Sequence, residues 1–148
     1  MSSTFLKIIS TNPSFVLDQG RVESARTFLY KFYQKTQIEF VTTDTIEFVD
    51  QGENFESVRC NLCGIEMETE TWQNAMDRAY KDHFEDLSFI TGCCNKRTAL
   101  NNLEYNWPAG FARSVISISG PQNGLTEKDL EELANVVGSQ LKIIWAKY

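Results

Sequence analysis

Apolar and polar residues alternate along the first third of the chain in a way that predicts a strand, a helix and a second strand. Residues 5–9 form a short apolar run that ends before Pro13, which cannot easily extend a central strand. Apolar residues then recur three and four positions apart and predict a helix over residues 20–35. Residues 37–50 alternate again and predict a half-buried strand, bent or bulged near Thr43 and Asp44.

The end of the chain repeats this order. Residues 111–120 alternate and predict a strand that ends before Pro121. We expect a helix to begin at Thr126, because its hydroxyl can accept a hydrogen bond from a free amide and the acids that follow face the positive end of the helix dipole. Gly138 is a natural terminator of this helix, and residues 141–145 predict the last strand.

Two β-α-β units in sequence predict an α+β fold of the ferredoxin-like type, a βαβ-βαβ chain that forms an antiparallel sheet with two helices on one face. In this arrangement the second and third strands are neighbours, but here about fifty residues separate them. We therefore expect a ferredoxin-like domain from residues 1–56 and 111–148, with a lobe formed by residues 57–110 inserted between its second and third strands. An insertion of that length needs a stabilising agent of its own.

All four cysteines lie inside this insertion, at Cys60, Cys63, Cys93 and Cys94. Two cysteines separated by two residues and followed by glycine can present both sulfurs to one ion, and a second pair thirty residues later completes a four-sulfur site of the zinc-ribbon type. Structural zinc binds finger peptides with roughly 10–16 kcal/mol, comparable with the ~5–15 kcal/mol stability of a whole domain. The pattern predicts a structural zinc ion that determines whether the lobe folds.

The second pair leaves an alternative open. Side chains of adjacent cysteines diverge in extended backbone and converge on one ion only in a turn. If only one of Cys93 and Cys94 binds, the fourth ligand is His83, the only histidine of the chain. The competing interpretation places His83 on the exposed side of a helix that the apolar spacing predicts over residues 70–84.

Residues 98–113 follow the second cysteine pair and interleave large apolar residues with asparagines around a Trp-Pro turn. One interpretation is structural: asparagine tolerates turn geometry, and the segment packs the lobe against the sheet. The other is an interaction surface in which Tyr105 and Trp107 serve as large anchors beside Arg97.

Four segments also resemble a bacterial protein family of unknown function. They are VDQGENFESVRC, CNLCG, GCCN and ALNNLEYNWPAGFAR, similar to that family's VDQGxNFESVxC, C-x-x-C-G knuckle, Cys-Cys pair and LNxLxYxWPAGFAR. The resemblance covers about half of the chain and implies a zinc-ribbon-like site without implying an activity. This sequence departs from zinc knuckles at Asn61 and Asn95, where such knuckles favour Pro and Gly.

Composition and charge narrow the class of protein. The 148 residues, 42% apolar and 23% charged, are typical of one globular domain with a compact insertion. The net charge is −6 and no segment is basic, which argues against a nucleic-acid partner because such binding depends on Lys and Arg. No run approaches the ~20 apolar residues of a membrane helix, so we expect a soluble cytoplasmic protein without a membrane segment.

These observations favour a zinc-stabilised binding or regulatory module that contacts a protein partner. The first alternative is a thiol- or zinc-dependent enzyme. Against it, glutamates at positions 66, 68 and 70 oppose thiolate formation at the C-x-x-C pair, and catalytic zinc needs an open coordination position. The second alternative, a nucleic-acid adaptor, rests on analogy between folds alone.

Overall fold

The structure is a computed structural model that describes residues 3–148. These residues form a mixed α+β fold in which a four-stranded antiparallel sheet has the strand order β2-β7-β1-β8. None of their helices is long and apolar enough to cross a lipid bilayer. The elements are β1 (Thr4–Ser10), α1 (Gln19–Leu29), the 3-10 turn η1 (Lys35–Gln37), β2 (Ile38–Val49), β3 (Ser57–Arg59), α2 (Thr69–Tyr80), β4 (Ser88–Ile90), β5 (Arg97–Ala99), the 3-10 turn η2 (Leu100–Asn102), β6 (Glu104–Asn106), β7 (Gly110–Ser119), α3 (Glu127–Val137) and β8 (Leu141–Lys147).

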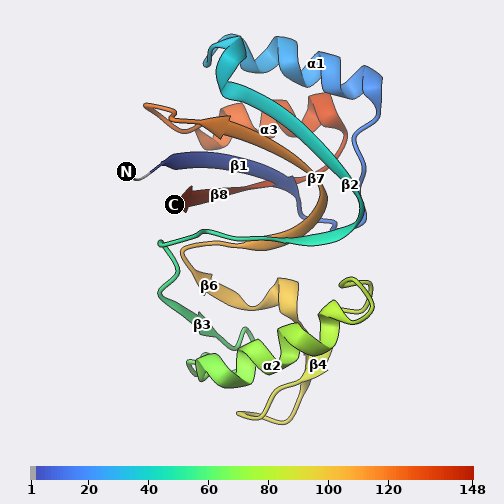
Figure 1. The fold of residues 1–148 in the computed structure, drawn as a ribbon, viewed down its shortest axis with the longest axis vertical. Coiled ribbons are helices and arrows are strands. Elements are labelled where there is room, and N and C mark those ends of the chain that lie inside the picture. The colour runs from blue at the N-terminus through green and yellow to red at the C-terminus, as the bar shows by residue number, and fades with distance from the viewer. Residues whose placement is uncertain (1–2) are drawn as a thin grey trace.

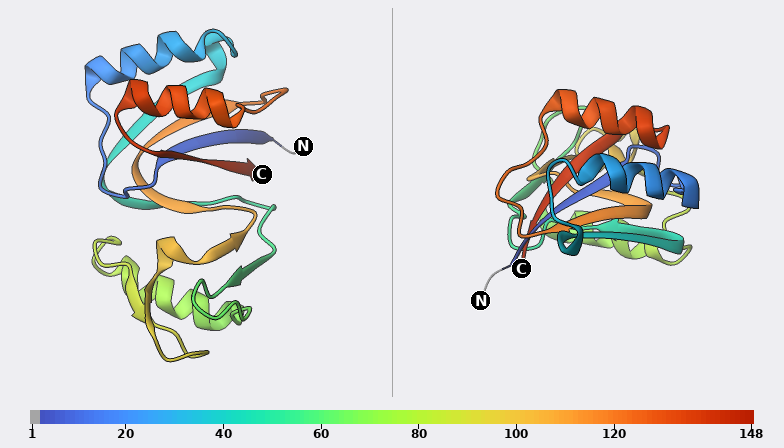
Figure 2. Two further views of the ribbon diagram at one scale, coloured as in Figure 1. Left: turned by 180° about the vertical axis from the view of Figure 1, so that it is seen from behind. Right: turned by 90° about the horizontal axis from the view of Figure 1, so that it is seen from above.

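Helices α1 and α3 cover one face of the four-stranded sheet (Figures 1 and 2). The caps predicted for α3 are confirmed: the Thr126 hydroxyl accepts a hydrogen bond from the Asp129 amide at 3.1 Å, and Gly138 ends the helix with φ 79°. The apolar stripes of both helices meet the sheet in a first core, formed by Leu6, Ile8, Ala25, Phe28, Leu29, Tyr33, Ile38, Ile116, Ile118, Leu133 and Val137.

Strands β2 and β7 carry the chain from this sheet toward a second part of the molecule. Their pairing shifts register between Thr42 and Glu47, which confirms the bulge predicted near Thr43 and Asp44. The Arg113 Nε donates a hydrogen bond to the Thr43 carbonyl at 2.9 Å and holds the bulge. Beyond it the two strands bend and run past the end of β1, as Figure 1 shows.

Residues 57–109 form a lobe on these strand ends, with α2 packed against the small ladders β3-β6 and β4-β5 (Figure 1). Its core contains residues of both parts, because Ile46 of β2 and Phe111 of β7 are buried in it. The lobe is therefore built on the long strands and does not enclose a separate core. The remaining buried members are Val58, Trp72, Ala75, Met76, Ala79, Phe84, Leu87, Leu100 and Leu103.

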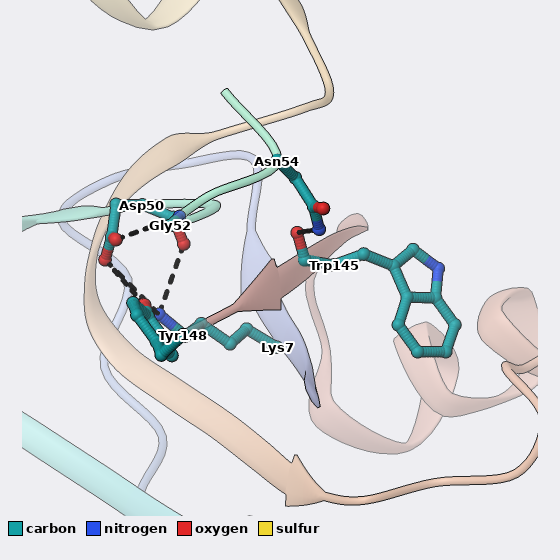
Figure 3. Close-up of polar contacts among 6 residues, drawn as sticks. All are labelled: Lys7, Asp50, Gly52, Asn54, Trp145 and Tyr148. Carbon is teal, nitrogen blue, oxygen red and sulfur yellow. Dashed lines mark hydrogen bonds and ion pairs between the residues drawn. The ribbon is translucent and has the colours of Figure 1, made fainter. Parts of the chain in front are cut away.

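The segment that leaves β2, residues 50–54, lies along the outer edge of β8 (Figure 3). The Lys147 amide donates to the Gln51 carbonyl at 3.2 Å, and the Glu53 amide donates to the Lys147 carbonyl at 2.7 Å. The Asn54 side-chain amide donates to the Trp145 carbonyl at 3.1 Å. These bonds pair backbone groups that an edge strand would otherwise leave open to other chains.

Asp50 is the centre of a polar cluster at this segment (Figure 3). Its carboxylate accepts hydrogen bonds from the Gly52 amide at 3.0 Å and the Tyr148 hydroxyl at 2.9 Å, and it pairs with Lys7 at 3.4 Å. Lys7 also donates to the Tyr148 hydroxyl. Burial would raise the pKa of Asp50, but the hydrogen bond from Tyr148 and the charge of Lys7 outweigh it and lower that pKa.

Two predicted helices end earlier than their apolar spacing indicated. The first was expected to reach residue 35, but α1 ends at Leu29, and Phe32 of the predicted stripe is 42% exposed. The second was expected to reach residue 84, but α2 ends at Tyr80. His83 and Phe84 have φ 58° and 61°, and this left-handed backbone stops the helix and turns Phe84 into the lobe core.

Candidate metal centre

The structure brings the four cysteines of the lobe together. Their sulfur atoms all lie within 4.8 Å of one another, and none of the four forms a disulfide. The Sγ atoms of Cys60 and Cys94 are 3.9 Å apart, and those of Cys63 and Cys93 are 3.3 Å apart. This arrangement is a candidate metal site.

The first two sulfurs are placed by a tight turn after β3, residues 60–65, which we call the first knuckle. The Cys60 amide donates to the Ile65 carbonyl, and the Gly64 amide donates to the Cys60 carbonyl, each at 2.9 Å. Gly64 has φ 76°, a conformation that glycine adopts without steric cost. The turn also directs the Leu62 amide at the Cys60 sulfur, at 3.4 Å.

A turn of the same construction follows β4, and we call residues 91–96 the second knuckle. The Thr91 amide donates to the Lys96 carbonyl, and the Asn95 amide donates to the Thr91 carbonyl, each at 3.0 Å. Asn95 has φ 54°, so it takes the left-handed position that Gly64 holds in the first knuckle. Asparagine tolerates this conformation better than most residues, which explains its place here.

The matching hydrogen bonds align the knuckles residue by residue. Cys94 takes the place of Cys63, and Thr91 takes the place of Cys60. A cysteine is therefore missing from the first position of the second knuckle, which Thr91 occupies. The fourth sulfur comes instead from Cys93, at the position that Leu62 holds in the first knuckle. Adjacent cysteines can both reach the centre because the turn, unlike a strand, folds the backbone around it.

The four sulfurs differ in their surroundings. Cys60 is buried and Cys94 is half-buried, and the Thr91 hydroxyl lies 3.1 Å from the Cys94 sulfur. Cys63 and Cys93 are exposed. We call Cys60 and Cys94 the inner pair and Cys63 and Cys93 the outer pair.

Neighbouring groups shift the acidity of the thiols in opposite directions. Burial would raise the pKa of Cys60, but hydrogen bonds from the amides of Cys63 and Leu62 lower this pKa to about 7. The amide of Ile65 would lower the pKa of Cys63, but the neighbouring Cys93 sulfur, burial and the other cysteines raise it to about 12. Four thiolates this close would repel one another, and a cation held among them would offset that repulsion.

His83 is not part of the sulfur cluster. It is exposed in the turn after α2, with its ring centre 6.0 Å from that of Tyr80. The metal-ligating group found among residues 3–148 consists of the four cysteines. The geometry therefore favours four sulfurs over three sulfurs and His83.

The three residues of the predicted interaction surface lie in different environments. Tyr105 is half-buried in the lobe core, where its hydroxyl accepts from the Trp72 Nε1 at 3.2 Å and donates to the Leu100 carbonyl at 2.8 Å. This placement fits the structural interpretation of Tyr105. Trp107 is 42% exposed, and Arg97 is exposed with its guanidinium bonded to the Ser88 hydroxyl at 3.1 Å.

Sequence reasoning missed how two residues shape the site. Thr91 is 1% exposed and supports Cys94; its only signal is the spacing Thr-x-x-Cys, which repeats Cys-x-x-Cys with one change. The Asn61 side chain accepts a hydrogen bond from the Thr98 hydroxyl at 2.7 Å and so ties the first knuckle to β5. A proline at position 61 could not make this bond.

Comparison with protein families, with curated proteins and with solved structures finds no match to this chain.

Proposed function

We propose that this chain is a zinc-stabilised binding or regulatory module that acts through contact with a protein partner. The observation that carries the zinc assignment is the sulfur cluster. Zinc binds thiolate sulfur at about 2.3 Å in a tetrahedron, whose edges are then about 3.8 Å long. The distance of 3.9 Å within the inner pair lies close to that value, and that of 3.3 Å within the outer pair is about 0.5 Å shorter. All the sulfur-sulfur distances are within 4.8 Å, so small shifts bring the four atoms around one ion.

The proposal extends to the type of fold, a ferredoxin-like domain with a zinc-ribbon-like insertion between its second and third strands. The strand order β2-β7-β1-β8, with antiparallel neighbours and two helices on one face, supports the first part. The two matching knuckles support the second part. The proposal also includes the resemblance of four segments of the chain to the bacterial family of unknown function.

A structural role for the zinc follows from the number of ligands. Catalytic zinc keeps a coordination position open for water or substrate, whereas four cysteine sulfurs occupy all positions of a tetrahedron. The four cysteines are contributed in pairs by segments 30 residues apart in sequence. An ion held among them closes the lobe, which is the task expected of structural zinc.

The exposed surface of the lobe supports a protein partner. The four most exposed large apolar side chains in residues 3–148 all belong to it: Leu62, Ile65, Tyr80 and Ile90, at 48–59% exposure. Leu62 and Ile65 lie in the first knuckle, and Ile90 is the residue before the second. Apolar side chains held in place by a rigid turn lose little entropy when a partner covers them.

Metal content and coordination test the zinc assignment. The purified protein is expected to carry one zinc ion per chain, with four sulfur neighbours in X-ray absorption spectra. Cys60→Ser should lose the ion and lower the melting temperature. The control His83→Gln should retain both, because this side chain lies outside the cluster. An oxygen neighbour would support a catalytic zinc instead, and metal-free protein that fails to take up zinc on reconstitution would refute the site.

Comparative affinity purification tests the partner assignment. A double variant, Leu62→Asp with Ile65→Asp, is compared with the native chain in extract of the source cells, after both are shown to carry zinc. We expect a protein that the native chain retains in fixed ratio to be lost from the variant. Equal recovery of all retained proteins by both chains would place the interaction surface away from the first knuckle.

A further inference from the structure

We propose that the outer pair, Cys63 and Cys93, is a redox modification site at which a peroxide forms a disulfide between the two knuckles. The disulfide displaces the zinc and takes over the closure of the lobe. The release of zinc rests on the proposed function, whereas the choice of the cysteine pair rests on the geometry of the thiols alone.

Exposure and distance select the outer pair. Cys63 and Cys93 are the two cysteines classed as exposed, and their sulfurs are already only 3.3 Å apart. A disulfide bond is about 2.0 Å long, so the two sulfurs need to approach by little more than 1 Å. A cysteine is oxidised more readily when it is a thiolate and when the oxidant can reach it. All four zinc-bound sulfurs are thiolates, so access to the oxidant decides among them.

The two cysteines of the inner pair are less accessible to an oxidant than those of the outer pair. Cys60 is fully buried and its sulfur receives the Leu62 amide, while the Cys94 sulfur lies 3.1 Å from the hydroxyl of the buried Thr91. The source of the difference is the residue at position 91. Because threonine occupies the first position of the second knuckle, the fourth sulfur comes from Cys93, whose counterpart Leu62 is 48% exposed.

The reaction is a two-electron oxidation by a peroxide such as hydrogen peroxide. One outer thiolate attacks a peroxide oxygen; an S–O bond forms, the O–O bond breaks, and the hydroxide that leaves takes a proton to become water. The other outer thiolate then attacks the resulting sulfenic acid. An S–S bond forms, the S–O bond breaks, and a second hydroxide is protonated. Two thiolates are oxidised, and one hydrogen peroxide is reduced to two waters.

The disulfide keeps the two knuckles joined after the zinc has left. The new bond joins residues 30 positions apart, one from each knuckle, as the ion did. A bond within the first knuckle, or between Cys93 and Cys94, would leave the knuckles unconnected. Since a cross-link over a long loop restricts the unfolded chain, the oxidised lobe is expected to stay folded after zinc leaves. Reduction in the presence of zinc restores the starting state.

Peptide mapping of the zinc-loaded native chain tests the pairing. The protein is treated with one equivalent of hydrogen peroxide, its remaining thiols are alkylated, and the digest is analysed by mass spectrometry, while a chromogenic chelator follows free zinc. We expect a cross-linked peptide joining Cys63 to Cys93, alkylated Cys60 and Cys94, and one zinc released per disulfide. A dominant Cys60–Cys63 or Cys93–Cys94 bond, or sulfinic acids in place of a disulfide, would overturn the proposal.

A double variant tests the role of position 91. Thr91→Cys with Cys93→Ser moves the fourth sulfur to the first position of the second knuckle and gives both knuckles the spacing Cys-x-x-Cys. It should bind zinc, form no cross-link at position 93, and release zinc several-fold more slowly at the same peroxide concentration. Leu62→Ser, the matched control at the counterpart position, should oxidise like the native chain. A double variant that holds zinc and loses it as fast as the native chain would overturn the proposal.

The two proposals fail separately. If the native chain binds no zinc, the zinc module is refuted, and mapping the metal-free protein still tests which thiols pair. If zinc is bound by four sulfurs but the cross-link forms elsewhere, the redox site is refuted and the zinc module stands.

Discussion

Thr91 and Cys60 occupy equivalent positions in two turns with the same hydrogen bonds, yet only Cys60 brings a sulfur to the cluster. A threonine hydroxyl stays neutral, so it can hydrogen-bond a thiolate but is a poor substitute for one as a zinc ligand. Its neighbour two residues on, Cys93, supplies the missing sulfur from outside. The residue type at position 91 thus bears on one of the two exposed sulfurs, that of Cys93.

Tyr105 is a half-buried residue whose hydroxyl joins two groups of the lobe core. Its hydroxyl bridges the Trp72 indole and the Leu100 carbonyl, and burial raises its pKa, so it stays a proton donor. Tyr105→Phe keeps the ring but leaves both partners unpaired inside the lobe. We expect a loss of about 1–3 kcal/mol in the free energy of unfolding, measured by urea denaturation of the zinc-loaded protein.

The control for this change is Tyr80→Phe, because the Tyr80 side chain is 59% exposed on the same lobe. Its effect should stay within about 0.5 kcal/mol, as for most surface substitutions. Equal effects of the two substitutions would mean that the buried hydroxyl bonds of Tyr105 do not contribute to stability.

At the scale of elements, the end of α3 depends on a contact with α1. Gly138 has φ 79°, and a methyl group there would lie 1.7 Å from Nη1 of Arg21, which donates to the Val137 carbonyl at 2.6 Å. Gly138→Ala therefore adds backbone strain and displaces the flexible end of Arg21, which breaks its bond to α3. We expect a loss of more than about 1 kcal/mol, read as a lower urea midpoint.

Gly120→Ala is the matched control, since Gly120 also has a positive φ, 55°, but no atom lies within 4 Å of the added methyl. It carries the backbone strain alone. The difference between the two variants measures the contact of α3 with Arg21, and a difference of zero would contradict the role assigned to that contact.

Elements whose signals are local could be predicted from the sequence. Thr126 and Gly138 mark the ends of α3 because a cap acts on the backbone of its own turn. The end of α1 could not be found in the same way, since apolar spacing continues to Phe32 although the helix has stopped. The ladders β3-β6 and β4-β5 have three residues per strand, too few to leave an alternating pattern.

The candidate site also combines features that could be predicted from the sequence with features that could not. The four cysteines were predicted as a set from their spacing, and the structure places their sulfurs together. Which of them are exposed could not be predicted, because it depends on the alignment of two turns distant in sequence. The spacing Thr-x-x-Cys was the only signal of Thr91, and it gained meaning once the hydrogen bonds of the two knuckles made Thr91 the counterpart of Cys60.

At the scale of the whole molecule, the lobe is held against the sheet at two places. One is the shared core, to which Ile46 and Phe111 contribute from β2 and β7. The other is the segment of residues 50–54 along β8, fastened by the Asp50 cluster (Figure 3). Two separate attachments restrain rotation of the lobe better than one, so the knuckles are presented in a fixed direction relative to the sheet.

The Asp50 cluster makes this attachment dependent on pH. The folded state lowers the pKa of Asp50, so its contribution to stability is present above the ordinary value of about 3.9 and is lost as the pH falls through the lower, folded value. Asp50→Asn removes the charge that Lys7 and Tyr148 bind. At neutral pH we expect it to cost about 1 kcal/mol, a small value because the carboxylate is partly exposed.

In acid this difference between Asp50→Asn and the native chain should shrink, because the native carboxyl group then also becomes neutral. Urea denaturation of both proteins between about pH 7 and pH 3 measures it. Thiols that gain protons release zinc from both proteins alike, so the comparison isolates Asp50. Asp44→Asn, at the exposed bulge of β2, is the control and should differ little from the native chain throughout. If the free energy of unfolding of Asp50→Asn stays below that of the native chain by the same amount at every pH, the charge of Asp50 does not contribute to the stability of the attachment.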